Sequence, residues 1–180
     1  MQKESNQSAI SIDDLKKYFE GFDTTDLVFK SIEKWGSDIP GSKYLLMDSL
    51  KDFVTFKFSK SHCENLGGYF AVNPKTTTGV GLDIEEPNRI TYSVVRRIYP
   101  KVTEDNFKET WVALEAAFKG LRGFKQPQTL SQLTLEGFEK INSQIETFCL
   151  KDSQNYGVKN TRGLVFKTDS HFFAFFMCTP

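Results

Sequence analysis

The chain has 180 residues, a length that favours one domain over two. Its composition, 39% hydrophobic and 26% charged, is typical of globular proteins and excludes a wholly disordered chain. The 23 basic and 23 acidic residues cancel, which argues against nucleic acid or an anionic membrane as the partner. We expect residues 1–10 to be disordered and residues 11–180 to form a single domain.

The cysteines and the apolar runs bear on where the protein works. Cys63, Cys149 and Cys178 are odd in number and far apart, with no second Cys or His at metal-binding spacing. They are therefore expected to be reduced thiols, which indicates a cytoplasmic protein. No apolar run has the length of a signal peptide or a membrane span, so we expect no membrane association. His171, inside an apolar run, is expected to be a strand residue with a hydrogen-bonded ring.

The N-terminal part of the chain predicts two helices followed by strands. Ser11 is suited to cap a helix over 11–22, and Gly36 ends a second predicted helix over 24–36. Alternating and apolar runs then predict three strands, with the segment 74–78 as a hairpin loop between the last two. These strands are expected over 52–58, 67–73 and 79–85.

The C-terminal part predicts helices over 91–99 and 103–123, the second with acidic residues at its start and basic residues near its end. Apolar residues at roughly helical spacing predict a further helix over 130–149. The segments 162–168 and 171–178 read as two final strands. This mixed order of elements predicts an α+β fold.

The strand "GVGLDIE" (79–85) ends in carboxylates that need an explanation. Alternation along a strand places Asp83 and Glu85 on one face, about 7 Å apart, while Glu86 points away. Acidic residues in solvent at a strand end would be the simpler interpretation, since carboxylates are mostly exposed.

The helix that follows favours a different interpretation. Trp111, Glu115 and Lys119 are spaced four residues apart and share one helical face, and we expect Trp111 to be core packing. Glu115 and Lys119 alone would make an ordinary surface pair, but the segment between them is Ala-Ala-Phe. An alanine-rich face lets the helix approach the strand closely and would bring Glu115 near Asp83 and Glu85. Three carboxylates in one cleft repel one another, so the pattern predicts a bound divalent cation, with Mg²⁺ the best suited.

These residues resemble the signature of the 4'-phosphopantetheinyl transferase superfamily, which runs G-x-D-x-E and then W-x-x-K-E-x-x-x-K. The matching segments are "GVGLDIE" and "WVALEAAFK" (111–119). Upstream, "FSKSHCENLGGYFAV" (58–72) is similar to the SHS strand and loop of the surfactin-synthetase-activating type. "VVRRIYP" (94–100) is similar to the end of the family's RFF helix. The resemblance covers residues 52 to about 125.

The resemblance implies a fold of two similar α+β halves forming a pseudo-dimer, here roughly 11–75 and 76–180, with the first half abbreviated. It also implies a holo-acyl-carrier-protein synthase activity that depends on Mg²⁺ or Mn²⁺. Such an enzyme transfers 4'-phosphopantetheine from coenzyme A to a serine of an apo acyl or peptidyl carrier protein of fatty acid or polyketide biosynthesis. The by-product is 3',5'-ADP. Because both halves lie in one chain, a monomer is expected.

The resemblance also implies roles for particular residues. Asp83, Glu85 and Glu115 match the metal-binding carboxylates, and Glu115 is also the candidate base. Lys119 matches the lysine that holds the phosphate of the transferred arm. Ser61 and His62 match coenzyme A contacts, with His62 on the 3'-phosphate.

The chain departs from the family pattern at a few positions. Leu114 stands where most relatives have Lys, Cys63 replaces the second Ser of SHS, and no Arg precedes Arg89. These departures leave open a weak or inactive relative that binds coenzyme A or carrier protein without turnover. A metal-dependent phosphohydrolase would explain the carboxylates but not His62. The candidate replacements for the missing arginines are Lys43, Lys57 and Lys60.

A basic surface for an acidic carrier protein is a further expectation, although ordinary solvated charges would explain the same residues. The residues concerned are Arg96, Arg97, Lys101, Lys108, Arg122 and Lys125.

Overall fold

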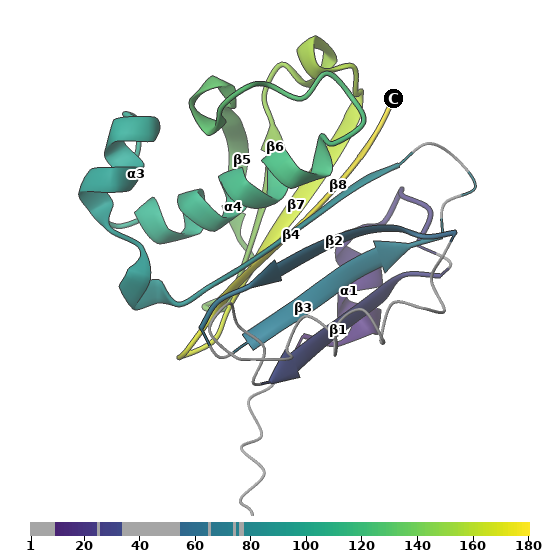
Figure 1. Ribbon diagram of the computed structural model, residues 1–180, viewed down its shortest axis with the longest axis horizontal. Coiled ribbons are helices and arrows are strands. Elements are labelled where there is room, and N and C mark those ends of the chain that lie inside the picture. The colour runs from purple at the N-terminus through teal and green to yellow at the C-terminus, as the bar shows by residue number, and fades with distance from the viewer. Residues whose placement is uncertain (1–9, 25, 34–54, 65, 74, 76–77) are drawn as a thin grey trace, which may run out of the picture.

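The computed structural model describes residues 10–24, 26–33, 55–64, 66–73, 75 and 78–180 (Figure 1). Disorder was expected over residues 1–10. Residues 1–9 lie outside the described residues, as does Lys43, whereas Ile10 is buried in the core, so the prediction is wrong for that residue. Helix α1 (Ile12–Tyr18) forms where it was predicted. It begins at the predicted cap, because the Ser11 hydroxyl accepts a hydrogen bond from the Asp14 N–H at 3.0 Å.

A three-stranded antiparallel sheet follows, with the order β1-β3-β2 (Figure 1). Its strands are β1 (Val28–Glu33), β2 (Lys57–His62) and β3 (Leu66–Val72). The predicted strand over 67–73 is confirmed. The strand expected over 52–58 instead runs from Lys57 to His62, and residues 52–54 of that prediction lie outside the described residues.

The helix predicted over 24–36 is wrong where the structure describes it, because Val28–Glu33 form β1. Residues 25 and 34–36 of that prediction lie outside the described residues. Val28 to Glu33 pair residue by residue with Ala71 to Leu66 of β3. Phe29 packs its ring against Phe175, with the ring centroids 4.9 Å apart. Pairing with β3 and burial of this aromatic side chain outweigh the helical spacing, which is a weak local preference.

A five-stranded antiparallel sheet has the order β4-β8-β7-β6-β5. The predicted strand over 79–85 and the two predicted final strands are confirmed. The hairpin expected between the segments 67–73 and 79–85 is wrong, because the first of these strands belongs to the three-stranded sheet and the second to the five-stranded sheet. The strands are β4 (Gly79–Glu85), β5 (Leu135–Lys140), β6 (Ile145–Leu150), β7 (Asn160–Lys167) and β8 (Phe172–Thr179).

The helix predicted over 130–149 is also wrong. This segment forms a 3₁₀ turn (Leu130–Gln132) and then the paired strands β5 and β6. Gly137 adopts φ +66° where the register of the pair shifts, a bulge conformation that favours glycine. Phe138 remains exposed, so the helical spacing of apolar residues here does not mark a buried helical face.

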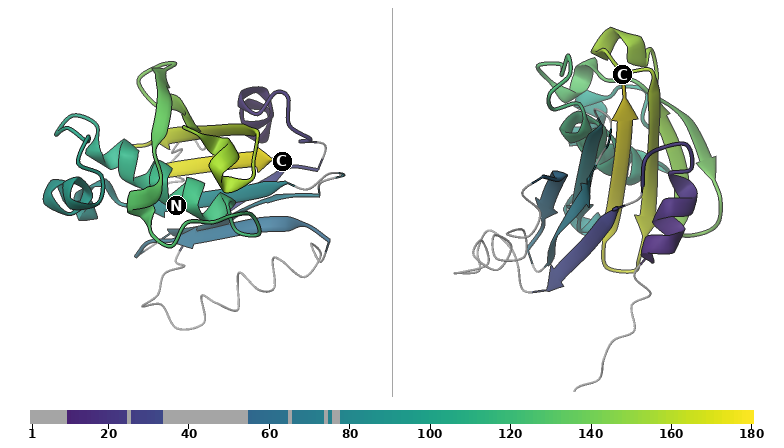
Figure 2. Two further views of the ribbon diagram at one scale, coloured as in Figure 1. Left: turned by 90° about the horizontal axis from the view of Figure 1, so that it is seen from above. Right: turned by 90° about the vertical axis from the view of Figure 1, so that its right-hand side faces the viewer.

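The two remaining helices, α3 (Tyr92–Ile98) and α4 (Phe107–Gly120), agree with prediction, although α4 begins at residue 107 rather than 103. Helix α4 packs on one face of the five-stranded sheet, and α3 packs against α4. Ala174, Phe176 and Cys178 of β8 face the α3–α4 side. The alternate β8 residues, Phe173, Phe175 and Met177, face a second core shared with α1 and the three-stranded sheet (Figures 1 and 2).

The protein is therefore a mixed α+β fold, as predicted. The strands before residue 75 form the three-stranded sheet and those after residue 78 form the five-stranded sheet. Within the described ranges, none of the helices has the length and apolar character needed to cross a membrane.

Candidate functional site

The two sheets meet along a seam between strands β2 and β4, each at the edge of its own sheet. The Leu82 N–H donates a hydrogen bond to the Ser59 hydroxyl at 2.9 Å, and the Ile84 N–H donates to the Ser61 hydroxyl at 3.1 Å. The serines thus satisfy edge-strand donors that would otherwise be buried without a partner. Serine at alternate positions of β2 fixes the register between the two sheets.

Helix α4 lies directly on β4, as the alanine-rich sequence predicted. A methyl group at Gly81 would lie 1.8 Å from the Ala116 carbonyl oxygen, and one at Gly79 would lie 2.1 Å from the Gly120 carbonyl oxygen. Only glycine permits this approach of helix backbone to strand backbone. The close contact brings the side chains of α4 onto the seam.

Asp83 is almost completely buried, with 3% of its surface exposed, and it faces a positive charge. Its Oδ1 atom accepts a hydrogen bond from Lys119 Nζ at 2.7 Å and another from the Ser61 hydroxyl at 2.9 Å. Its Oδ2 atom is buried and has no hydrogen-bond partner among the residues that the structure describes. A buried carboxylate oxygen without a donor is costly, so this atom is the natural position for a bound cation or donor.

Glu85 and Glu115 are half-buried, and both have a raised pKa. Burial raises the pKa of Glu85, the negative charge of Asp83 raises it further, and the resulting pKa is about 7 despite the opposing effects of Arg89 and Lys119. Burial also raises the pKa of Glu115, as does Asp83, against the opposing charge of Lys119. The predicted clustering of the three carboxylates on one side of β4 is therefore present in their electrostatics.

The carboxylate cluster of Asp83, Glu85 and Glu115 is more open than a closed coordination shell. Within the described part of the chain, the oxygens of these residues do not form a group lying within 4.8 Å of one another. The donor set is nevertheless all oxygen, the pKa values record mutual repulsion, and one Asp83 oxygen is left without a donor. These features fit a hard divalent cation such as Mg²⁺ or Mn²⁺, held by Asp83 Oδ2 and the two glutamates.

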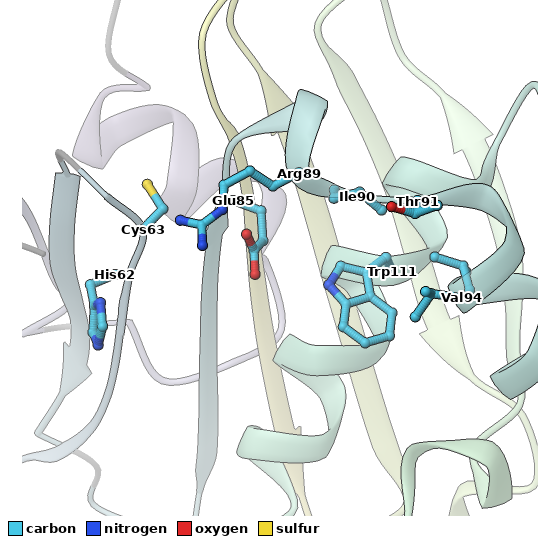
Figure 3. Close-up of a pocket in the computed structure, with 9 residues that line it drawn as sticks. His62, Cys63, Glu85, Arg89, Ile90, Thr91, Val94 and Trp111 are labelled. Carbon is cyan, nitrogen blue, oxygen red and sulfur yellow. The ribbon is translucent and has the colours of Figure 1, made fainter. Parts of the chain in front are cut away.

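A pocket of about 290 Å³ opens at the end of the seam where Glu85 lies (Figure 3). In Figure 3 the Arg89 guanidinium lies beside Glu85, and the Trp111 ring lies on the other side of that carboxylate. The lining residues are His62, Cys63, Glu85, Arg89, Ile90, Thr91, Val94, Val95 and Trp111.

Sequence reasoning placed His62 and Glu85 at the site but assigned Trp111 only to core packing. Trp111 packs against the core and also lines the pocket. Its position one turn before Glu115 on the same helical face was the signal that it would reach the site. Arg89, the first arginine of the chain, also lies in the pocket wall.

A second pocket of about 290 Å³ opens at the other end of the seam. Three cations line it, Lys57, Lys119 and Arg122, and its described lining residues include no acid. Of the three candidate replacement lysines, Lys57 lines this pocket together with Lys119. The remaining lining residues are Phe58, Ser59, Thr78, Gly79, Val80 and Gly123.

The structure shows what surrounds Leu114, a departure from the family pattern, and Ser61, a position that matches it. Leu114 is completely buried in the core between α4 and the sheet, so this position faces away from the carboxylates. Ser61 is buried, and its hydroxyl donates to Asp83 while it accepts from the Ile84 N–H and from Lys119 Nζ at 3.2 Å. In this structure Ser61 therefore positions Asp83 and Lys119.

Comparison with protein-family models finds no family model that matches the chain, and comparison with curated proteins finds no match either.

The geometry suits chemistry on a phosphorylated substrate. The seam carries an acidic cluster, a lysine at its centre and one pocket at each end. A divalent cation on the carboxylates and the nearby lysine would together stabilise negative charge on a phosphoryl group.

Proposed function

We propose that the protein is a 4'-phosphopantetheinyl transferase, which moves the phosphopantetheine arm of coenzyme A to a serine hydroxyl of an apo acyl or peptidyl carrier protein. The observation that carries the proposal is the convergence of three motifs that lie far apart in the sequence. Ser61 of β2, Asp83 of β4 and Lys119 of α4 meet through hydrogen bonds of 2.7 to 3.2 Å. The motif glutamates Glu85 and Glu115 join the same electrostatic cluster.

We further infer that the fold is the pseudo-dimeric fold of that family, with an abbreviated first half. The division of the strands into two sheets at residues 72–79 supports this inference, because it coincides with the expected boundary between the halves. The seam between the sheets then corresponds to the cleft that holds coenzyme A, and one chain supplies both sides of it.

In the proposed reaction the carrier serine attacks the β-phosphorus of coenzyme A. A new serine O–P bond forms, the bond to the adenosine phosphate breaks, and 3',5'-ADP leaves. Glu115 takes the serine proton, and burial suits it for this because a raised pKa makes the carboxylate a stronger base near neutral pH. Lys119 Nζ lies where it can leave Asp83 and bind a phosphate oxygen instead. It would then neutralise the negative charge of that phosphate.

The divalent cation supplies charge neutralisation on the pyrophosphate when it is bound. Asp83, Glu85 and Glu115 would hold it, with Asp83 contributing the oxygen that lacks a donor. Burial first, and then the charge of Asp83, raise the pKa of both glutamates, and the cation would relieve the part that comes from charge repulsion.

The two pockets give the two substrates separate approaches to the reacting phosphate. His62 and Arg89 place donors in the first pocket, which suits the 3'-phosphate end of coenzyme A. Lys57 and Arg122 give the second pocket a positive wall beside Lys119. A carrier protein with acidic residues around its serine would be attracted to that side.

One assay tests this function. The protein is incubated with coenzyme A, Mg²⁺ and an apo carrier protein, and the carrier is weighed by mass spectrometry. We expect the carrier to gain one phosphopantetheine group, and we expect the gain to disappear with EDTA or with Asp83→Asn. Glu104→Gln, which changes an exposed acid on the loop before α4, is the matched control and should keep the activity.

The same assay separates the alternatives. The ion pair between Lys119 and Asp83 is the observation that favours a non-catalytic relative, because each group neutralises the other. Binding of coenzyme A by calorimetry without any change in carrier mass would establish that alternative. Metal-dependent release of phosphate from coenzyme A, again without carrier modification, would establish a phosphohydrolase.

A further inference from the structure

A second group of potential metal ligands lies apart from the carboxylate cluster. One ligand atom each of Cys63, Glu86 and His171 lies within 4.8 Å of the others. Cys63 follows β2, Glu86 follows β4 and His171 precedes β8, so the three residues come from three different segments. The group therefore joins the end of the three-stranded sheet to two strands of the five-stranded sheet.

His171 is held in an orientation that suits metal binding. The Thr168 N–H donates to the His171 carbonyl at 2.9 Å, and the His171 N–H donates to the Thr168 hydroxyl at 2.9 Å. These bonds fix the backbone of the turn. The ring Nδ1 lies 2.9 Å from the Ser170 hydroxyl. A bond of this kind on one ring nitrogen is what fixes the tautomer and the ring direction of metal-binding histidines.

The other ring nitrogen of His171 is the atom that points to a ligand. Nε2 is buried and makes no hydrogen bond within the described part of the chain. When Nδ1 donates to Ser170, Nε2 carries an unshared electron pair in a place that water does not reach. A buried polar atom of this kind requires an explanation, and a bound ion is one of the few available. Burial also lowers the pKa of His171, which keeps the ring in the neutral form that binds metal.

The neighbours of the His171 ring are suited to the same ion. Cys63 is buried and keeps a reduced thiol, whose Sγ lies 3.5 Å from the Leu66 carbonyl oxygen, a long and weak hydrogen bond. The Glu86 carboxylate lies close enough for its charge to act on His171. A thiol, an imidazole and a carboxylate form a mixed set that a hard cation such as Mg²⁺ does not prefer.

We propose that Cys63, Glu86 and His171 form a binding site for Zn²⁺, separate from the carboxylate cluster on β4. Zinc accepts sulfur, nitrogen and oxygen ligands with bonds of about 2.0–2.3 Å, so tetrahedral ligand atoms lie roughly 3–4 Å apart. The group already lies within 4.8 Å, so small side-chain rotations complete the site. Three protein ligands leave the fourth position for water or another small ligand.

The location of the site gives the ion a mechanical effect. It would fasten the turn between β2 and β3 to the ends of β4 and β8, at the same end of the seam as the first pocket. Cys63 itself lines that pocket, next to His62 (Figure 3). A ligand that binds only the folded chain stabilises it, so Zn²⁺ should raise the melting temperature. The site does not depend on the transferase proposal.

The first experiment uses the full chain, stripped of metal and kept reduced. Zn²⁺ is titrated in competition with a chromophoric chelator, and Co²⁺ is titrated as a spectroscopic probe. We expect one equivalent of Zn²⁺ to bind, with a higher melting temperature that EDTA reverses. We also expect Co²⁺ to give the intense thiolate-to-metal absorption and the visible bands of a tetrahedral site. Absence of stoichiometric Zn²⁺ binding, or a cobalt spectrum without thiolate absorption, overturns the proposal.

The second experiment assigns the ligands. Cys63→Ser and His171→Gln each remove a proposed ligand and should each weaken Zn²⁺ binding by more than about 100-fold. Ser170→Ala removes only the hydroxyl that orients the His171 ring and should weaken binding about tenfold. Cys149→Ser is the control for a thiol elsewhere, and Glu115→Gln is the control for the carboxylate cluster. Both should retain Zn²⁺ binding. Loss of binding in Glu115→Gln together with retention in Cys63→Ser would place the ion at the other site and overturn the proposal. Circular dichroism of each metal-free variant verifies that it is folded.

Discussion

Asp83 shows how a single residue can organise a site. It gives one oxygen to Lys119 and Ser61 and leaves the other buried without a donor. Its charge also raises the pKa of Glu85 and of Glu115. The result is a cluster that is costly in the metal-free protein and that a cation would stabilise.

The raised pKa of Glu85 predicts a pH dependence of stability in the metal-free protein. The folded chain holds the Glu85 proton up to about pH 7, whereas an ordinary glutamate loses it near pH 4.5. Between these two values the folded state binds more protons than the unfolded state, so the free energy of unfolding falls as the pH rises. Above about pH 7 the loss from this residue is complete.

Glu85→Gln removes this titration. Chemical denaturation in EDTA at pH 5 and pH 8 should show that the variant gains stability relative to the wild-type protein at pH 8 and little at pH 5. The comparison of the two proteins at each pH cancels the contributions of the other titrating groups. An equal difference at both pH values would mean that burial does not raise the pKa of Glu85.

Strand parity and helical spacing are geometric rules, so the sequence alone predicts that Asp83, Glu85 and Glu115 share one side of β4. Asp83, Glu85 and Glu115 follow from those rules. The group of Cys63, Glu86 and His171 does not, because its members approach one another only through the packing of two sheets. His171 was expected to be a strand residue with a hydrogen-bonded ring. It instead lies just before β8 and is not part of that strand, and its ring contacts the Ser170 hydroxyl through Nδ1 while Nε2 has no hydrogen-bond partner in the described part of the chain.

Among the elements, the pair of β4 and α4 decides the geometry of the seam. Both predictions for this pair agree with the structure, because the glycines and alanines that allow close approach are visible in the sequence. The segments 24–36 and 130–149 were predicted as helices and form strands. Their apolar spacing fits either element, and pairing with distant strands decides the outcome.

The close approach of β4 and α4 predicts that Gly81→Ala is destabilising. The new methyl group would meet the Ala116 carbonyl oxygen, so α4 must move away from the strand. Overpacking of this kind costs about 3 kcal/mol of unfolding free energy. Urea denaturation measures the loss. The obstacle is a backbone atom, so the double variant Gly81→Ala with Ala116→Gly should not recover stability. Recovery would show that side-chain crowding alone keeps the elements apart.

A second connection joins α4 to the sheet. Lys167 of β7 lies between two carboxylates, with its Nζ 3.0 Å from Glu109 of α4 and 2.6 Å from Glu146 of β6. All three side chains are mostly buried. Removal of the lysine leaves two buried negative charges facing each other.

Lys167→Met is therefore expected to lower the free energy of unfolding by about 3 kcal/mol, measured by urea denaturation at pH 7. Lys151→Met, which changes an exposed lysine, is the control and should change it by less than about 0.5 kcal/mol. The loss should shrink at low pH, where the glutamates are protonated. A cost that is independent of pH would assign the effect to packing of the lysine stem rather than to its charge.

On the scale of the whole molecule, the six basic residues expected to attract a carrier protein do not form one surface. Arg96, Arg97 and Lys101 lie on or just after α3, whereas Arg122 and Lys125 follow the far end of α4 (Figure 1). The 14 residues of α4 span about 21 Å. Exposed charges are screened within about 8 Å at physiological salt, so the two groups act separately.

The second pocket decides between the two groups. Arg122 lines it together with Lys57 and Lys119, next to the centre of the seam, whereas the α3 arginines line neither pocket. Under the proposed function, we expect Arg122→Glu to raise the KM for the carrier protein several-fold at low salt and to leave the KM for coenzyme A unchanged. The effect should fade as salt is added, because the attraction acts through screened charges.

Steady-state kinetics at two salt concentrations measure this difference. Lys140→Glu, on the exposed strand β5, is the control, because it changes the net charge by the same amount away from both pockets. Arg97→Glu, on α3, should raise the KM for the carrier protein less than Arg122→Glu does. A larger effect of Arg97→Glu would place the docking surface at α3. Equal effects of Arg122→Glu and Lys140→Glu would show that net charge, rather than the local basic wall of the second pocket, governs the encounter.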